Sequence, residues 1–249
     1  MWMGTQMVFS ADPRHNHLIA ALPHGDWPRW RAQLTPVELA PGQVLYEAGT
    51  VVRQVYFPTQ GLISKQHVTR DGGTSELAVV GREGIIGTSA FLGGGPHLHR
   101  VVALTAAQVW RMPGVALLAE CRDSALVQPL LLRYTQALMT QMAQTAVCTR
   151  LHRLDQRLSR WLLMALDRSD GDEVPLTHEA IAQLLGVRRE GVTEAAGRLQ
   201  RAGVIRYARG RIQVLDLAGL MASSCECHGV VQGEYERLLW LGRSTRMAA

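Results

Sequence analysis

The spacing of hydrophobic residues changes from strand-like to helical along this chain of 249 residues. From Val37 to Met112, short runs rich in Val, Tyr, Phe, Ile and Thr alternate with PG, AG, DGG and GGGP turns. Repeated short strands separated by glycine turns are typical of a β-barrel or jelly roll. From Ser124 to Arg168 there is no glycine, and apolar residues recur every three or four positions. This pattern predicts a long helix followed by a second helix.

The long helix carries a stripe that could pack either on its own β domain or on a second copy of the chain. We predict that it pairs two subunits into a homodimer, because a stripe of this length is sufficient for a two-helix seam. The expected interface residues are Leu131, Tyr134, Leu138, Met142 and Thr145.

The segment from Leu176 to Asp216 predicts a helix, a turn, a second helix and a two-stranded wing. Thr177 is a suitable N-cap, and Gly186 suits the tight turn between the helices. The second helix is expected to start near Arg188 and to end at Gly203, before a hairpin with Arg209 and Gly210 at its tip. A short helix, EYERLLWLG, is expected in the tail.

These elements predict an α+β fold with three parts. Residues 15–122 form a β jelly-roll sensor domain that resembles cyclic-nucleotide-binding domains. Residues 123–168 form the dimerisation helix and a connecting helix. Residues 169–249 form a winged helix-turn-helix domain with a C-terminal tail.

Charge is concentrated in the helix-turn-helix segment. The net charge of the chain is +5, and from Leu176 to Leu215 seven Arg and three Glu give 7 − 3 = +4. Such a patch suits a phosphate backbone, although an ordinary solvated surface would carry the same charge. We expect a cytoplasmic protein, because the sequence shows no membrane-length apolar run, no signal peptide pattern and few cysteines.

The second helix of this segment has two faces. Its apolar face would pack on the preceding helix, whereas Arg189, Glu190, Thr193 and Glu194 lie on the polar side. Arginine can bind guanine in the major groove, and a carboxylate can accept a hydrogen bond from the cytosine amino group. We therefore expect base contacts here and phosphate contacts from arginines nearby. The candidate DNA-binding residues are Thr177, Arg188, Arg189, Glu190, Thr193, Glu194, Arg198, Arg209 and Arg211.

The sequence LTHEAIAQLLGVRREGVTEAAGRLQRAGVIRYARGRI, after a β-rich segment and a long helix, resembles the CRP/FNR superfamily, the relatives of the cyclic-AMP receptor protein. The resemblance implies a homodimeric transcription regulator that binds double-stranded DNA, with RNA polymerase as a further partner. Arg189 and Glu190 match the family's recognition helix, whereas Glu194 stands where a second Arg is frequent. The resemblance therefore implies a half-site that differs from that of the cyclic-AMP receptor protein.

The same resemblance places a nucleotide-binding cassette at VGREGIIGTSAFLGGGPHLHRVVALT. Its expected effector residues are Gly87, Thr88, Ser89, Arg100 and Val101. Thr88 stands where nucleotide-binding members have Glu, and Val101 replaces a small hydroxyl residue, so we predict no tight binding of cyclic AMP. Arg100 could alternatively form a structural ion pair. The cofactor stays unidentified, and the absence of cysteines before Cys121 argues against an N-terminal iron–sulfur cluster.

Two groups of residues could ligate metals. His97 and His99 would point the same way in a strand, although such pairs in loops are usually solvated. Cys225, Cys227 and His228 are soft ligands that could bind a metal or respond to oxidation. Because the sequence shows no fourth ligand beside these three, the simpler interpretation is that they are small buried residues, and we expect no metal.

A β-rich domain of this kind could also serve two other functions. An enzyme built on the β domain is not expected, because we find no nucleophile motif, no P-loop and no compact His-x-His set. The alternative is a cyclic-nucleotide-like regulatory module that acts on a protein partner, which the basic helix-turn-helix disfavours.

Overall fold

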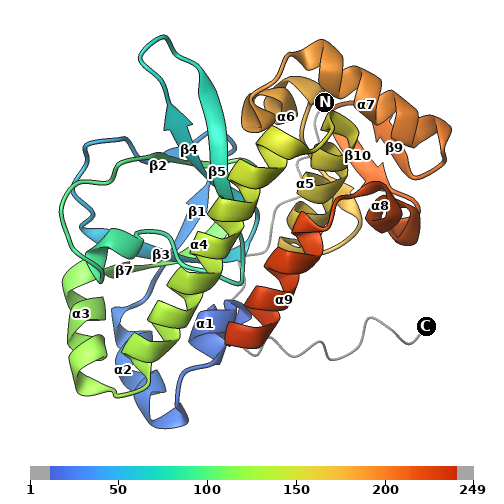
Figure 1. The fold of residues 1–249 in the computed structure, drawn as a ribbon. Coiled ribbons are helices and arrows are strands. Elements are labelled where there is room, and N and C mark those ends of the chain that lie inside the picture. Colours follow the sequence, from blue (N-terminus) through green and yellow to red (C-terminus); the bar gives the residue numbers. More distant parts are fainter. Residues whose placement is uncertain (1–11, 240–249) are drawn as a thin grey trace, which may run out of the picture.

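The computed structural model describes residues 12–239 and places a β-rich domain beside a mainly helical C-terminal domain (Figure 1). Short helices η1 (Pro13–His15), α1 (His17–Ala20), η2 (His24–Asp26) and α2 (Trp27–Gln33) precede the first strand. The sequence analysis did not predict them. Trp30 of α2 is buried and meets Phe57 edge to face, with ring centroids 5.6 Å apart, so these helices close one end of the β-rich core.

The β-rich domain consists of two antiparallel sheets, as the strand pattern predicted. One sheet has the order β1-β7-β3 and the other has the order β2-β6-β4-β5. Their strands are β1 (Thr35–Leu39), β2 (Val44–Tyr46), β3 (Gln54–Gln60), β4 (Ile63–Val68), β5 (Thr74–Val80), β6 (Arg100–Ala103) and β7 (Ala107–Pro113), with the short helix η3 (Thr88–Ala90) before β6.

Three helices follow the β-rich domain. Helix α3 (Gly114–Asp123) leads into the long helix α4 (Val127–Leu151), which runs between the β-rich domain and α9 (Cys227–Leu239) (Figure 1). Helix α5 (Leu154–Arg168) begins after extended backbone at His152 and Arg153. The long helix and its successor are thus confirmed, whereas α3 was not predicted.

The buried face of α4 corrects the predicted subunit interface. Leu131, Tyr134 and Leu138 are at most 3 % exposed within the single chain. Tyr134 donates a hydrogen bond to the Ile85 carbonyl at 3.3 Å, and its ring meets that of Tyr235. These residues therefore pack on their own β domain and on α9, which was the other alternative for this stripe.

The remaining two residues of that stripe are partly buried. Met142 packs against the same core, and the Thr145 hydroxyl accepts a hydrogen bond from Arg160 at 3.0 Å. Neither presents the open apolar surface that a subunit seam requires.

Helix α9 packs along α4 through polar and aromatic contacts (Figure 1). The Tyr235 hydroxyl donates to Gln141 at 3.0 Å, and the Gln136 amide donates to Glu234 at 3.2 Å. The predicted helix EYERLLWLG is confirmed from Glu234 to Leu239, but the helix begins earlier, at Cys227. The last three predicted residues, 240–242, lie outside the described residues.

The helix-turn-helix domain combines helices with a small antiparallel sheet of order β8-β10-β9. A direct hydrogen bond links this domain to the sensor, because Trp161 of α5 donates to Glu76 of β5 at 2.7 Å. The other elements are β8 (Glu173–Val174), α6 (His178–Leu185), α7 (Arg189–Arg201), β9 (Ile205–Ala208), β10 (Arg211–Val214) and α8 (Leu217–Ser223). In the part of the chain that the structure describes, no helix has the length and apolarity to cross a membrane.

Candidate DNA-binding surface and sensor cassette

The turn between α6 and α7 has the local structure that the sequence predicted. The Thr177 hydroxyl accepts a hydrogen bond from the Ala180 N–H at 3.1 Å and caps α6. Gly186 ends α6 in the left-handed region, at φ 63°, where a side chain would be strained. Arg188 has extended backbone and is the N-cap of α7. The turn thus sets the start of α7 within one residue of the prediction.

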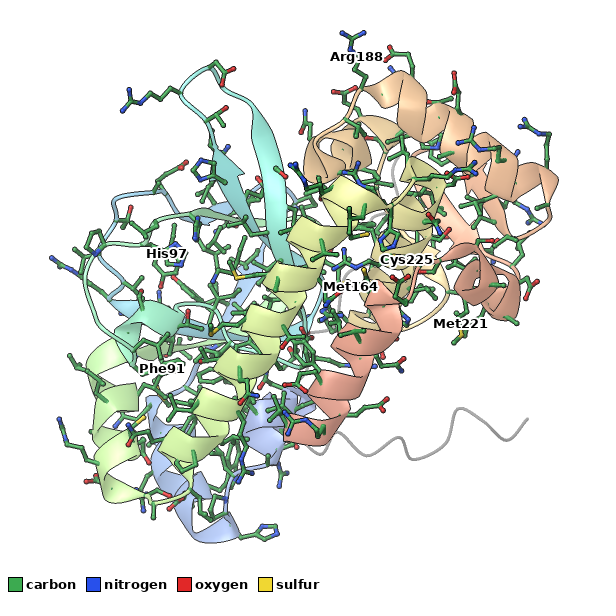
Figure 2. The ribbon with its side chains drawn as sticks, in the orientation of Figure 1. Phe91, His97, Met164, Arg188, Met221 and Cys225 are labelled. Atoms are coloured by element: carbon green, nitrogen blue, oxygen red, sulfur yellow. The ribbon has the colours of Figure 1, made fainter. Side chains whose placement is uncertain are left out.

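Helix α7 separates a buried face from an exposed one. Val192, Ala195, Ala196 and Leu199 are buried against the domain core. On the opposite side, four exposed side chains at the start of the helix make no hydrogen bond or ion pair with any described residue: Arg188, Arg189, Glu190 and Glu194. Figure 2 shows Arg188 projecting outward from this end of the domain. These polar groups are available for a ligand outside the chain.

The Thr193 hydroxyl is occupied by the protein itself. It donates to the Arg189 carbonyl at 3.1 Å and lies 3.1 Å from Nδ1 of His178. A hydroxyl has one hydrogen, so Thr193 accepts from His178, whose ring stacks on Tyr207 with centroids 3.8 Å apart. Burial, together with the nearby Arg189 cation, lowers the pKa of His178. Thr193, one of the candidate DNA-binding residues, therefore also fastens α7 to α6 and the wing, a role that was not expected from the sequence.

The expected phosphate-binding arginines fall into two groups. Arg198 pairs with Asp155 at 3.5 Å, and Arg211 pairs with Glu173 at 2.6 Å. Arg209 occupies the hairpin tip at φ 50°, followed by Gly210 at φ 77°. Two consecutive positive φ angles match a two-residue type I′ hairpin. Arg209 thus projects from a tight turn, whereas Arg198 and Arg211 are held by acids of their own domain.

The expected effector residues of the sensor cassette are buried or partly buried. Gly87, at φ 97°, precedes the short helix that contains buried Thr88, and Val101 of β6 is fully buried. Ser89 lines a surface cavity of ≈ 510 Å³ beside α3. The Nε of Arg100 lies 3.4 Å from a Glu47 carboxylate oxygen. The ion pair that was the alternative for Arg100 is therefore present in this structure.

Two histidines of this cassette and a neighbouring lysine form a group of basic side chains. The His97 and His99 rings are 6.1 Å apart at 85°, and Nδ1 of His97 lies 2.7 Å from the His99 carbonyl oxygen. Figure 2 shows His97 inside the β-rich domain. Lys65 is 8 % exposed, and burial lowers its pKa and those of both histidines. The two imidazole rings therefore do not point the same way, as they would at alternate positions of a strand.

The cysteine-rich segment is arranged differently from the expectation. His228 turns away and bonds to Asp167 at 2.8 Å. The ligand atoms of Cys225 and Cys227 instead lie close to those of Cys148 and His152, which stand at the C-terminal end of α4. Burial raises the pKa of Cys148 to about 12 and that of Cys227 to about 11. Cys148 and His152 were not among the expected ligands, because nothing in their local spacing points to a segment so far along the chain.

Comparisons with known proteins agree with this architecture. The model of the Crp-like helix-turn-helix domain matches residues 156–223, and that of the cyclic nucleotide-binding domain matches residues 36–124. The transcriptional regulator SdrP of Thermus thermophilus is 30% identical over 180 residues, which cover 67% of this chain and 82% of SdrP. The global nitrogen regulator of Synechococcus elongatus is 26% identical over 193 residues, covering 72% of this chain and 85% of that protein.

A solved structure shows the same fold. FixK2 from Bradyrhizobium japonicum superimposes with a TM-score of 0.68 at 16% identity, covering 77% of this chain and 98% of FixK2. At this identity the likeness concerns the arrangement of domains and not individual side chains.

Proposed function

The chain belongs to the CRP/FNR family of transcription regulators, and on that premise we propose that it binds a two-fold symmetric DNA site as a homodimer. It carries the family's helix-turn-helix DNA-binding domain and its cyclic nucleotide-binding type of sensor domain. The curated relatives it matches are named as regulators, which supports a regulatory and not an enzymatic function. We place it in the cytoplasm, with RNA polymerase as a further partner.

The observation that carries this proposal is the open outer face of α7. Arg189, Glu190 and Glu194 share that face, and all three side chains are exposed and uncommitted. Arg189 has the donors that guanine O6 and N7 require, and a glutamate can accept from the cytosine amino group. In this arrangement Arg188 and Arg209 contact phosphates, and Thr193 keeps the helix in place.

The position of Arg198 supports a base contact by Glu194. An alternative role for Glu194 would be to hold Arg198, which lies four residues further along the same helix. The guanidinium of Arg198 instead lies 3.5 Å from Asp155 of α5. Glu194 is therefore not needed to position Arg198 and is free to contact a base.

The proposed subunit seam lies on the outward face of α4. Leu132 and Met139 are 47 % and 65 % exposed, which is unusual for large apolar side chains on a long helix. They belong to a run at alternating spacings of four and three, which is the heptad spacing of a two-stranded coiled coil. The run consists of Leu132, Gln136, Met139, Ala143, Ala146 and Arg150, all of them exposed. A parallel pair of such helices would present two copies of α7 to successive major grooves, about 34 Å apart.

Selection from randomised DNA on wild type and Glu194→Ala tests the proposal. We expect the variant to lose preference at one base pair of each half-site, at a cost of about 1–3 kcal/mol on the preferred site. Glu38→Ala is the matched control, since it removes an exposed glutamate from β1 of the sensor domain. Identical base preferences in all three proteins would rule out the base contact, and no sequence-specific binding by wild type would rule out the function.

A further inference from the structure

Four potential metal ligands from two distant segments converge at the C-terminal end of α4. Cys148 and His152 are four residues apart on the last turn and cap of that helix, and Cys225 and Cys227 flank the junction of α8 and α9. Their ligand atoms all lie within 4.8 Å of one another. Figure 2 shows Cys225 at this junction, near the ends of α4 and α9.

We propose that these four residues form a tetrahedral zinc site. The Sγ atoms of Cys148 and Cys225 are 3.6 Å apart, and Cys227 Sγ is 3.6 Å from Nδ1 of His152. With Zn–S bonds of about 2.3 Å, tetrahedral geometry places neighbouring sulfurs about 3.8 Å apart. The present spacing therefore accommodates a single ion with only small side-chain movements. An iron–sulfur cluster would place several atoms between the ligands and needs a wider separation.

The orientation of His152 supports metal ligation. Its Nδ1 faces the sulfurs, and its Nε2 lies 3.3 Å from a carboxylate oxygen of Glu226. Metal-binding histidines usually donate their second ring N–H to a carboxylate, which fixes the tautomer and aims the other nitrogen at the ion. Glu226 stands between the two cysteine ligands in sequence, so one short segment supplies both sulfurs and this carboxylate.

Burial and charge at the site suit the same ion. Cys148, Cys225 and Cys227 are 1 %, 6 % and 1 % exposed and form an apolar cluster of their own, separate from the main core. Three thiolates and a neutral imidazole around Zn²⁺ leave a net charge of −1. Arg160 is 5 % exposed, interacts electrostatically with Cys148 and Cys227, and has an Nε with no hydrogen-bond partner in residues 12–239. Its cation balances the remaining charge of the site.

Three cysteines and one histidine leave no open position on the ion, so the site is structural and not catalytic. The ion fastens the chain that follows the wing to the end of α4. It thereby holds α9 in its place along the long helix, independently of any DNA contact.

The test is metal content and cobalt spectroscopy of the full chain. After incubation with zinc and removal of loosely bound ions, we expect one zinc per chain in wild type and in Cys121→Ser, which removes a cysteine of α3 outside the cluster. Cys227→Ser should lose the bound zinc. Cobalt should give wild type the intense visible bands of tetrahedral cobalt with thiolate ligands. Glu226→Gln should keep the ion with about tenfold weaker affinity.

Other outcomes would overturn the proposal. Wild type that retains no zinc, or that gives an octahedral cobalt spectrum, contradicts it without reference to any variant. Full zinc content in Cys227→Ser, with circular dichroism like that of wild type, contradicts the assigned ligands. A Cys148–Cys225 disulfide in metal-free protein purified without reductant would identify the cluster as a thiol pair instead.

Discussion

The outward face of α4 gives a quantitative prediction about the proposed dimer. Met139 is 65 % exposed in the single chain. Burying a whole methionine side chain is worth about 1.5–3 kcal/mol, so covering the exposed part contributes about 1–2 kcal/mol per copy. A dimer contains two copies, and the total of about 2–4 kcal/mol corresponds to about a 30- to 700-fold change in the dissociation constant.

The change is Met139→Glu, which keeps a good helix former and adds two like charges at the seam. We expect sedimentation velocity to show a dimer dissociation constant raised at least about 30-fold. Met221→Glu is the matched control, because Met221 is a 51 % exposed methionine on α8, away from the seam. Figure 2 shows Met221 at the edge of the DNA-binding domain. This control should dimerise like wild type.

Leu138→Ala distinguishes the proposed seam on the outward face of α4 from the buried stripe that the sequence predicted. Leu138 is 3 % exposed, so its truncation should destabilise the folded chain by about 2–5 kcal/mol without a specific effect on association. A Met139→Glu protein that dimerises as tightly as wild type would refute the seam. So would a wild-type chain that sediments as a monomer at micromolar concentration.

Three further predictions concern the sensor, the DNA-binding domain and the contact between them. Calorimetry should show no tight binding of cyclic AMP, because Val101 is fully buried and Arg100 is paired with an acid. Micromolar binding of cyclic AMP, together with DNA binding that depends on it, would contradict this prediction. Burial lowers the pKa values of His97 and His178 below their unfolded value of about 6.5, so their contribution to stability is present above that pH and is lost as the pH falls through the folded pKa values. This prediction is refuted if the urea midpoint of unfolding does not decrease when the pH is lowered from 7.5 to 5.5. Trp161→Phe removes a hydrogen bond to buried Glu76 and should lower the free energy of unfolding by about 1–3 kcal/mol, measured by urea titration.

The parts of the fold that were predicted correctly depend on local chemistry. Thr177 caps α6 through its own hydroxyl, and Gly186 adopts a positive φ that ends the helix. The tip formed by Arg209 and Gly210 needs two positive φ angles, which a two-residue hairpin loop imposes. Each feature is determined by a few neighbouring residues, so it can be inferred without knowledge of the rest of the molecule.

The predictions that failed depend on which segments meet in space. The periodicity predicted one stripe on α4, which begins at Leu131, but a second stripe begins one residue later, at Leu132. Only the packing shows that the first faces the β domain and the second faces outward. Similarly, Cys148 and Cys225 are 77 positions apart, and they meet because α9 folds back along α4. No local pattern encodes such a contact.

These contacts give α4 two neighbours within the chain and leave it one exposed face. One face is packed into the sensor domain, a second carries α9, and the third is open for a partner subunit. Tyr134 touches both the sensor backbone at Ile85 and the ring of Tyr235, so one side chain of α4 contacts the sensor domain and α9 together. The proposed zinc ion would fix the other end of α9 against Cys148 and His152. The sensor domain is thus joined to α9 through α4, and to the DNA-binding domain through the hydrogen bond from Trp161 to Glu76.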